Sequence, residues 1–138
     1  MTIQVFIPPS TTSASRDSVT LAIPDLAASQ TVLTTVTLPK SCILLSVFST
    51  KKTWLRLYNR QDNAIADQSR LRTVDPSSGS GVMLEIINIL DSSLISLSPL
   101  VPISNMENTP TNTYYLRVTN DSNTAGISIT FNYLITEV

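Results

Sequence analysis

Apolar and polar residues alternate one by one in several short stretches of this 138-residue chain, and that pattern most limits the folds open to it. A two-residue period puts successive side chains on opposite faces of a β-strand, so each stretch predicts a strand with one buried face. The clearest case is "SITFNYLIT", in which one face carries Ile127, Ile129, Phe131, Tyr133 and Ile135. The stretches "QTVLTTVTLP" and "NTYYLRVTN" show the same period.

Further short strands are expected at 18–23, 42–49, 53–59, 81–88 and 94–99, with the segment 69–74 as another candidate. The polar loop "NDSNTAG" joins the strands expected at "NTYYLRVTN" and "SITFNYLIT", and its length predicts a C-terminal hairpin. The best helical candidate, "QDNAIADQSRL", is short and lies between two expected strands. Seven to nine short strands predict an all-β, single-domain, two-sheet antiparallel β-sandwich, jelly-roll-like or immunoglobulin-like in its connectivity.

Serine and threonine make up 37 of the 138 residues, which agrees with an all-β fold. Threonine suits the half-buried surface of a sheet, and serine with asparagine supports turns where glycine is scarce. The single cysteine, Cys42, lies in the apolar run "CILLSVF" and is expected to be buried. Because the chain has no histidine, Ser-His-Asp and Cys-His arrangements are excluded, and no metal or cofactor is expected.

Charge is sparse and balanced, with nine basic and ten acidic residues. So few cations argue against a grip on the phosphate backbone of nucleic acid. The N-terminus lacks the basic region and long apolar core of a secretory signal, and no apolar run is long enough to span a membrane. We therefore expect a soluble protein that contacts neither nucleic acid nor membrane.

Acid–base chemistry of the glycosidase kind would need a pair of carboxylates. The candidates are Asp62, Asp67, Asp75 and Glu85. Three of these lie in a loop beside arginines, where surface ion pairs are the ordinary outcome. The cluster "NDSN" at 120–123 has oxygen ligands but lacks the spacing of a calcium loop, so a turn is expected there. The chain is therefore predicted not to be an enzyme.

The stretch "TWLRLYN" is expected to present an aromatic and cationic stripe. Its alternation puts Trp54, Arg56 and Tyr58 on one face and Leu55 and Leu57 on the other. The leucines belong in the core, so the stripe should face outward and be exposed. Arginine stacks on aromatic rings, and Trp, Tyr and Arg are enriched at the energetic centres of protein interfaces. The stripe is therefore the first candidate for a protein contact.

The loop that follows, "RQDNAIADQSR", has a small apolar centre and is expected to fold back onto the sandwich. Arg60 and Arg70 are expected to pair with Asp62, Asp67 or Asp75 and to belong to the same interface. Exposed pairs of this kind contribute about 0–1 kcal/mol each, so they would order the surface of the loop without adding much to stability.

The N-terminal segment, 1–17, is set apart from the predicted β-sandwich domain, 18–138. It carries the apolar residues Ile3, Val5, Phe6 and Ile7, followed by two prolines and a Ser/Thr-rich tail. Two interpretations remain open: an arm that docks on a neighbouring subunit, or an edge strand of its own sandwich. In the first case Ile3, Val5 and Phe6 would belong to an interface.

Three segments carry a resemblance to a known group of proteins: "WLRLYNRQDNAIADQSR", "DPSSGSGVMLEI" and "LSPLVPISNMENTPTNTYYLRVTN". The chain resembles small phage-associated β-sandwich proteins, most of them uncharacterised, and the match covers roughly residues 42 to 135. The matching positions are Arg56, Leu57, Tyr58, Ala66, Asp67, Arg70, Asp75, Pro76, Gly81, Tyr115, Val118, Thr119 and Asn120. The resemblance implies that the protein is part of a virion, made in the host cytoplasm.

We therefore expect a non-enzymatic structural component of a phage virion, associated with the tail, baseplate or fibre. Its partners would be copies of itself in a homo-oligomer and neighbouring virion proteins. One alternative is a head decoration protein that cements adjacent capsomers. A second alternative is a carbohydrate-binding module that contacts host surface glycan through Trp54, Tyr58, Tyr114 or Tyr115.

Overall fold

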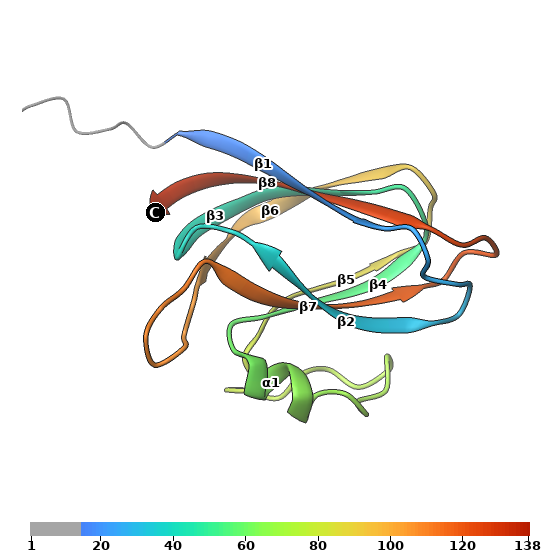
Figure 1. Cartoon of the computed structure of the whole chain (residues 1–138), viewed down its shortest axis with the longest axis horizontal. Helices are drawn as coiled ribbons and strands as arrows, with labels where there is room; N and C mark the ends of the chain where they lie inside the picture. Colours follow the sequence, from blue (N-terminus) through green and yellow to red (C-terminus); the bar gives the residue numbers. More distant parts are fainter. Residues whose placement is uncertain (1–14) are drawn as a thin grey trace, which may run out of the picture.

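The computed structural model describes residues 15–138, which form eight β-strands and one short α-helix (Figure 1). The strands are β1 (Arg16–Ile23), β2 (Thr31–Thr37), β3 (Ser41–Ser49), β4 (Thr53–Tyr58), β5 (Val82–Asn88), β6 (Ser93–Ser104), β7 (Thr113–Asn120) and β8 (Ile127–Glu137). The helix, α1, spans Gln61–Ala66. The predicted all-β fold is confirmed.

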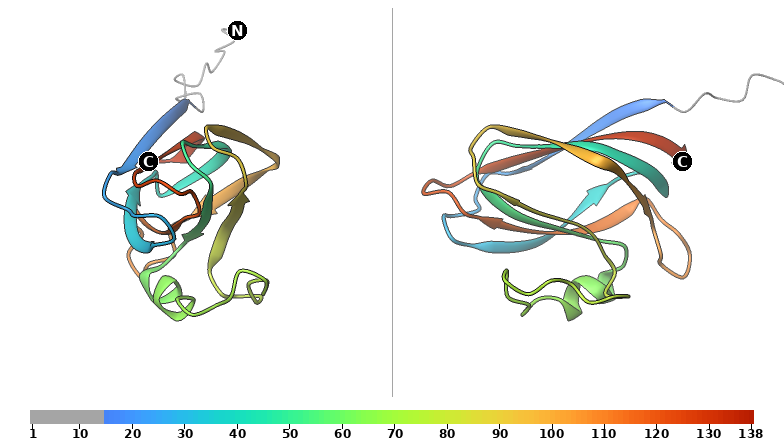
Figure 2. Two further views of the ribbon diagram at one scale, coloured as in Figure 1. Left: turned by 90° about the vertical axis from the view of Figure 1, so that its right-hand side faces the viewer. Right: turned by 180° about the vertical axis from the view of Figure 1, so that it is seen from behind.

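The strands form two four-stranded sheets, ordered β1-β8-β3-β6 and β2-β7-β4-β5, in which all neighbours are antiparallel. The sheets lie face to face in Figures 1 and 2. Every connection crosses from one sheet to the other except the one between β4 and β5. This order of eight strands is that of a jelly roll, so the two-sheet prediction is confirmed and the immunoglobulin-like alternative does not apply.

The core lies between the sheets and is built from the residues that the alternation places on one face. In β8, for example, Ile127, Ile129, Phe131 and Tyr133 are buried, and Ile135 packs against them. In β7 the core residues are Tyr114, Leu116 and Val118. Cys42 is a free thiol and is buried in the same core, as expected. A contiguous apolar layer of this kind supplies most of the driving force for folding.

The predicted C-terminal hairpin is wrong. β7 pairs with β2 and β4, whereas β8 pairs with β1 and β3 in the other sheet. The connection between them crosses the end of the sandwich and is held by the buried Asn120, whose amide donates to the carbonyls of Leu26 at 3.0 Å and Thr124 at 2.8 Å. A polar loop of that length suits either connection, and alternation alone does not say which sheet a strand joins.

Two further boundaries differ from expectation. The segment 69–74 forms turns and not a strand. β6 continues to Ser104 through Pro99 and Pro102, five residues beyond its predicted end at 99. β6 is an edge strand, and an edge tolerates proline because the missing N–H groups can face outward from the sheet.

β1 is also an edge strand, paired with β8 alone, and it begins at Arg16, two residues before the predicted start of the domain. The apolar residues Ile3, Val5 and Phe6 lie outside the described residues.

Candidate interaction surfaces

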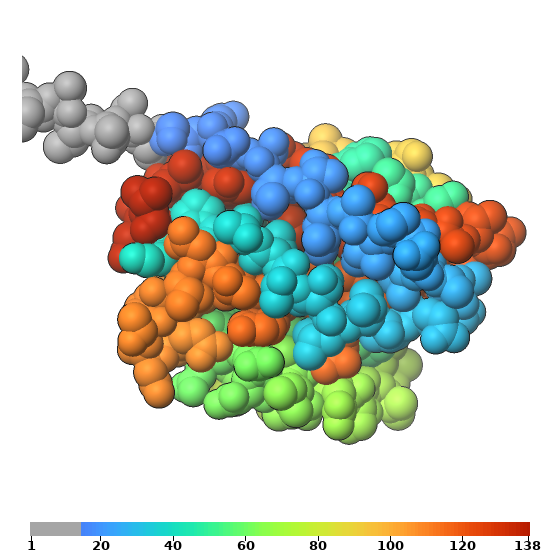
Figure 3. Space-filling view, in the orientation of Figure 1, coloured from blue at the N-terminus to red at the C-terminus, as the bar shows by residue number. Residues whose placement is uncertain are grey.

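The predicted stripe on β4 lies on the outer face of its sheet, but it is not exposed. Trp54 is 8% exposed, Arg56 2% and Tyr58 0%. The reason is the connection between β4 and β5: residues 59–81, including α1, form a layer over this face (Figures 1 and 3). The loop does fold back onto the sandwich as predicted, and for that reason the prediction of an exposed stripe is wrong.

Asp67 is the polar centre of the covered face. It follows α1 directly and is 8% exposed. Its carboxylate accepts hydrogen bonds from the Tyr58 hydroxyl at 2.5 Å and from Arg70 Nε at 2.6 Å and Nη2 at 3.1 Å. Arg56 Nη1 lies 3.5 Å from the same carboxylate and donates to the Asp67 backbone carbonyl at 3.3 Å. One residue of the connection thus binds two residues of the sheet beneath it.

Trp54 is held in the same network. Its indole Nε1 donates to Glu85 on β5 at 2.7 Å, and Arg70 Nη1 donates to the same carboxylate oxygen at 3.2 Å. The guanidinium of Arg56 lies 3.7 Å from the centroid of the indole ring, and that of Arg72 lies 5.0 Å from it. The predicted stacking of arginine on the aromatic ring is therefore present, but it holds the chain together internally.

The ionisation of this network follows from burial and hydrogen bonding. Burial by itself raises the pKa of Asp67, but the hydrogen bonds from Arg70 and Tyr58 outweigh it and leave the pKa below its ordinary value. Burial, and then the hydrogen bond to Asp67, raise the pKa of Tyr58 to about 12. Burial also lowers the pKa of Arg56. At neutral pH, Asp67 is therefore an anion and Tyr58 a neutral donor.

Positive charge exceeds negative charge under the cover. Arg56 and Arg117 are direct cross-strand partners, an arrangement that is unfavourable for like charges. Arg117 Nη2 donates to the backbone carbonyl of Ala64 in α1 at 2.7 Å. Among the described residues, the Nε atoms of Arg56 and Arg117 are buried and have no hydrogen-bond partner. The arginines of this face therefore depend on the connection for their hydrogen-bond acceptors, the backbone carbonyls of Asp67 and Ala64.

The other predicted ion pairs divide into buried and exposed ones. Arg60 pairs with Asp62 at 3.2 Å, and both side chains are accessible, as expected for a surface pair. The Arg70–Asp67 pair is buried instead, which the sequence alone did not indicate. Within residues 15–138, Asp75 makes no ion pair.

Three members of these networks were missed by sequence reasoning: the role of Glu85 beneath Trp54, Arg117 on β7, and a pair between Arg72 and Asp121. The last has two hydrogen bonds of 2.7 Å and joins the connection to the turn after β7. The alternation in "NTYYLRVTN" does put Arg117 on the outer face, which is the one signal that could have included it.

The geometry of the carboxylates does not suit a glycosidase pair. Asp67 and Glu85 share Arg70 as a partner, and Asp67 is held as an anion. A general acid needs the opposite, a carboxyl group whose pKa is raised so that it carries a proton. Among residues 15–138 no three His, Cys, Asp or Glu side chains are grouped as metal ligands, and no helix is long and apolar enough to cross a membrane.

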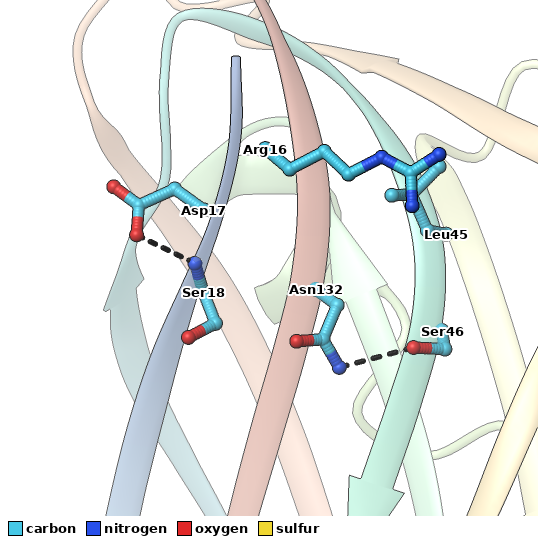
Figure 4. Close-up of a pocket in the computed structure, with 6 residues that line it drawn as sticks. All are labelled: Arg16, Asp17, Ser18, Leu45, Ser46 and Asn132. Atoms are coloured by element: carbon cyan, nitrogen blue, oxygen red, sulfur yellow. Dashed lines mark hydrogen bonds between the residues drawn. The ribbon is translucent and has the colours of Figure 1, made fainter.

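Within residues 15–138, no segment covers the outer face of the β1-β8-β3-β6 sheet in this way. One row across it consists of small polar residues in register: Ser18, Asn132, Ser46 and Ser96. Beside them lies a hollow of about 400 Å³, across which Arg16 extends from β1 over β8 toward Leu45 (Figure 4). Asn132 donates to Ser46 Oγ at 3.0 Å inside it. None of its lining residues is buried, so the hollow is a shallow depression in an accessible polar surface.

Exposed apolar side chains lie around the turn between β5 and β6. Ile87 is 46% exposed, Ile89 73%, Leu90 61% and Leu94 59%. Ile87 pairs with Trp54 and faces outward from the β2-β7-β4-β5 sheet, whereas Leu94 pairs with Phe48 and faces outward from the other sheet, so the four side chains do not form one patch. Ile89 and Leu90 lie in the turn itself, and single exposed apolar residues of this kind are ordinary on a protein surface.

Over residues 15–138 the protein is a jelly-roll β-sandwich in which the β4–β5 connection covers one outer face and leaves the other open. No protein-family model matches the chain, and no curated protein matches it in sequence.

Proposed function

We propose that the protein is a non-enzymatic structural component of a phage virion that acts through protein–protein contacts, in the tail, baseplate or fibre. The observation that carries the proposal is the jelly-roll framework, an architecture that viral capsid domains use. The resemblance of residues 42–135 to phage-associated β-sandwich proteins supports the same class.

The chemistry of the covered face favours a structural role over a binding or catalytic one. Its arginines, carboxylates and aromatic rings are engaged with one another: Asp67 with Arg70, and Glu85 with Trp54. A buried carboxylate that already accepts hydrogen bonds from neighbouring side chains is not free to hold a substrate. The contacts to partners would then come from apolar side chains and strand edges.

The carbohydrate-binding alternative loses its stacking platforms. Trp54, Tyr58 and Tyr114 are all buried, so they present no ring to a sugar. Tyr115 is half-buried on the outer face of β7 and is the one ring of the four with partial access. Head decoration remains the second candidate, because jelly-roll domains also build capsids.

Immunogold electron microscopy of particles from the lysate of the phage that encodes this chain tests the proposal. Gold on the tail or its tip would support the tail assignment, and gold over the head would replace it by the decoration role. Quantitative mass spectrometry of purified particles is the companion measurement, since a structural component should be present in several copies per particle. Absence of the chain from purified particles would refute both roles.

A further inference from the structure

β2 is an edge strand, and within residues 15–138 it pairs with β7 alone. Even-numbered residues make its backbone bonds to β7: the Leu38 N–H donates to the Asn112 carbonyl at 2.9 Å, and the Gln30 carbonyl accepts from the Asn120 N–H at 2.9 Å. Bonded and non-bonded pairs alternate along an antiparallel ladder, so the odd-numbered residues point their N–H and C=O groups away from β7. The free edge therefore presents the backbone groups of Thr31, Leu33, Thr35 and Thr37.

The other three edge strands carry features that hinder pairing with a further chain, namely charge, proline or an irregular register. β6 contains Pro99 and Pro102. In β1 the carboxylate of Asp17 accepts a hydrogen bond from the Ser18 N–H at 2.8 Å and so occupies a backbone donor of the strand. β5 carries Glu85, and its register with β4 shifts near one end. β2 has no charged residue, no proline and no register shift.

The sequence of β2 is nearly the same in both directions. In "TVLTTVT", Thr34 is the centre, Thr31 mirrors Thr37, and Val32 mirrors Val36. Two copies of β2 related by a two-fold axis at Thr34 would therefore place like residues opposite one another, with no charges in contact. This antiparallel register also sets odd-numbered residues opposite odd-numbered ones, so that the outward N–H and C=O groups of one copy meet those of the other.

The side chains at the centre of this register suit one another. Thr34 would lie opposite Thr34 of the second copy, and pairs of opposed threonine hydroxyls already occur in the sheets, at 2.7 Å for Thr31 with Thr119 and at 2.8 Å for Thr20 with Thr130. Val32 packs against the core but is only half-buried, because β2 has no neighbour on its outer side. A second copy would remove this side chain from water. β2, in cyan, lies at the surface in Figure 3.

We propose that β2 of one copy pairs with β2 of a second copy across a two-fold axis at Thr34, so that the two β2-β7-β4-β5 sheets become one continuous sheet. The interface is isologous, since the same strand is used by both copies, and strand addition of this kind draws its affinity from main-chain hydrogen bonds. The inference rests on the proposed function in that it names the self-contact that an assembly protein would use.

The first test is the oligomeric state of the full chain, measured by light scattering from micromolar to near-millimolar concentration. The wild type should dimerise. Thr35→Pro removes one outward N–H from each copy and leaves the bonds to β7 in place, so it should weaken dimerisation about ten-fold or more. Unchanged far-ultraviolet circular dichroism and melting temperature show that the variant is folded.

Ala22→Pro is the matched control on another edge. Ala22 is exposed in β1, and the Ile135 N–H donates to the Ser15 carbonyl, so by alternation the odd-numbered residues of β1 bond to β8 and the N–H of Ala22 points outward. The same change of backbone on β1 should leave the dimer intact. An equal loss for the two variants would contradict the assignment of the contact to β2.

Disulfide crosslinking then tests the register. Thr34→Cys puts two cysteines directly opposite each other at a non-bonded position, where Cα atoms lie about 4.5 Å apart, so mild oxidation should give a covalent dimer. Thr35→Cys is the control, because its two copies lie on a diagonal about 7–8 Å apart, which is too far for a disulfide. Cys42 is 1% exposed and therefore does not compete.

The remaining outcomes also decide. A wild-type chain that stays monomeric at near-millimolar concentration overturns the proposed pairing, and so does a dimer that survives Thr35→Pro. Crosslinking through Thr35→Cys in place of Thr34→Cys overturns the two-fold register. These results leave the virion function standing through another surface, whereas absence of the chain from purified particles removes that function and leaves the β2 pairing to be judged by the dimer alone.

Discussion

The outer faces of the two sheets are very different surfaces, although the same two-residue alternation produces both. The β2-β7-β4-β5 face carries Arg56, Glu85 and Arg117 and is covered by residues 59–81. The β1-β8-β3-β6 face carries mainly small hydroxyl and amide side chains, such as Thr20 and Thr130, whose hydroxyls lie 2.8 Å apart. One face is a buried ionic network and the other an accessible polar plane.

The difference shows what a covering segment does to the same kind of residue. A charged side chain on an open face keeps its water, whereas one under a cover must find partners within the protein. Asp67 supplies those partners on the covered face. Side chains on the open face have no comparable requirement. Substitutions under the cover should therefore lower the unfolding free energy by about ten times as much as substitutions on the open face.

The largest effect is expected from Asp67→Ala. The substitution leaves Arg56, Arg70 and Tyr58 without their shared acceptor, and breaking a buried ion pair from one side costs about 3–5 kcal/mol. Urea-induced unfolding measures the loss. Asp62→Ala is the matched control: its pair with Arg60 is accessible, so it should cost at most about 1 kcal/mol. Equal losses for the two variants would contradict the covered-face interpretation.

Acid should also destabilise the protein through Asp67. Because the folded-state pKa of Asp67 is below its ordinary value, its contribution is present above about pH 4 and is lost as pH falls through the lowered pKa. The unfolding free energy of the wild type should therefore fall more steeply below pH 4 than that of Asp67→Ala. Parallel acid profiles would show that the carboxylate is not coupled to folding.

Tyr58→Phe should cost about 1.5–3 kcal/mol, as for a hydrogen bond to a charged group. The substitution should also change how the unfolding free energy declines at alkaline pH. The pKa of Tyr58 is raised to about 12, so its contribution is complete below pH 10 and is lost as pH rises through 12. Unfolding measured between pH 9 and pH 11 should show a shallower decline for the variant. An unchanged slope would assign the decline to Tyr114 and Tyr133, whose pKa values are also raised.

Two glycines in the covering connection separate backbone strain from steric overlap. Gly79 and Gly81 have nearly the same positive φ, +77° and +80°, so alanine is strained at both. A Cβ at Gly79 meets nothing within 4 Å, whereas one at Gly81 would overlap the side chains of Asn63 and Asn59. Thermal unfolding should show Gly81→Ala to be about 1–2 kcal/mol worse than Gly79→Ala. Equal losses would mean that the two asparagines move aside freely.

The smallest effect is expected on the open face. Thr130→Ala removes one side of the hydroxyl pair with Thr20, but water replaces the lost partner, so stability should change by less than about 0.5 kcal/mol. The same urea titration measures it. A loss above 2 kcal/mol would show that this face is also covered in solution, for instance by another copy of the chain.

Much of the local structure could be predicted from the sequence. The alternation in "SITFNYLIT" and "NTYYLRVTN" identifies β8, β7 and their core residues, because strand periodicity is a property of neighbouring positions. The small apolar centre of "RQDNAIADQSR" likewise predicts the fold-back, and Ala64 is fully buried there. The candidate contact stripe was placed on the correct face of β4 by the same rule.

What alternation does not predict is whether a face is open. Trp54, Arg56 and Tyr58 would be exposed on a bare sheet, and they are buried because Asp67 and Arg70, more than eight positions along the chain, return over them. Arg117 meets the carbonyl of Ala64 across 53 positions of the chain. No local pattern contains such contacts.

The sequence by itself therefore determined most of the strands, the buried faces of those with clear alternation and the buried cysteine, since side-chain period and hydropathy act between near neighbours. Only the tertiary structure decided that β7 and β8 belong to different sheets and that the arginine–aromatic stripe is an internal network. Those outcomes depend on which distant segments pack together, and the free energy of that packing comes from pairs of residues that the chain brings into contact only when it folds.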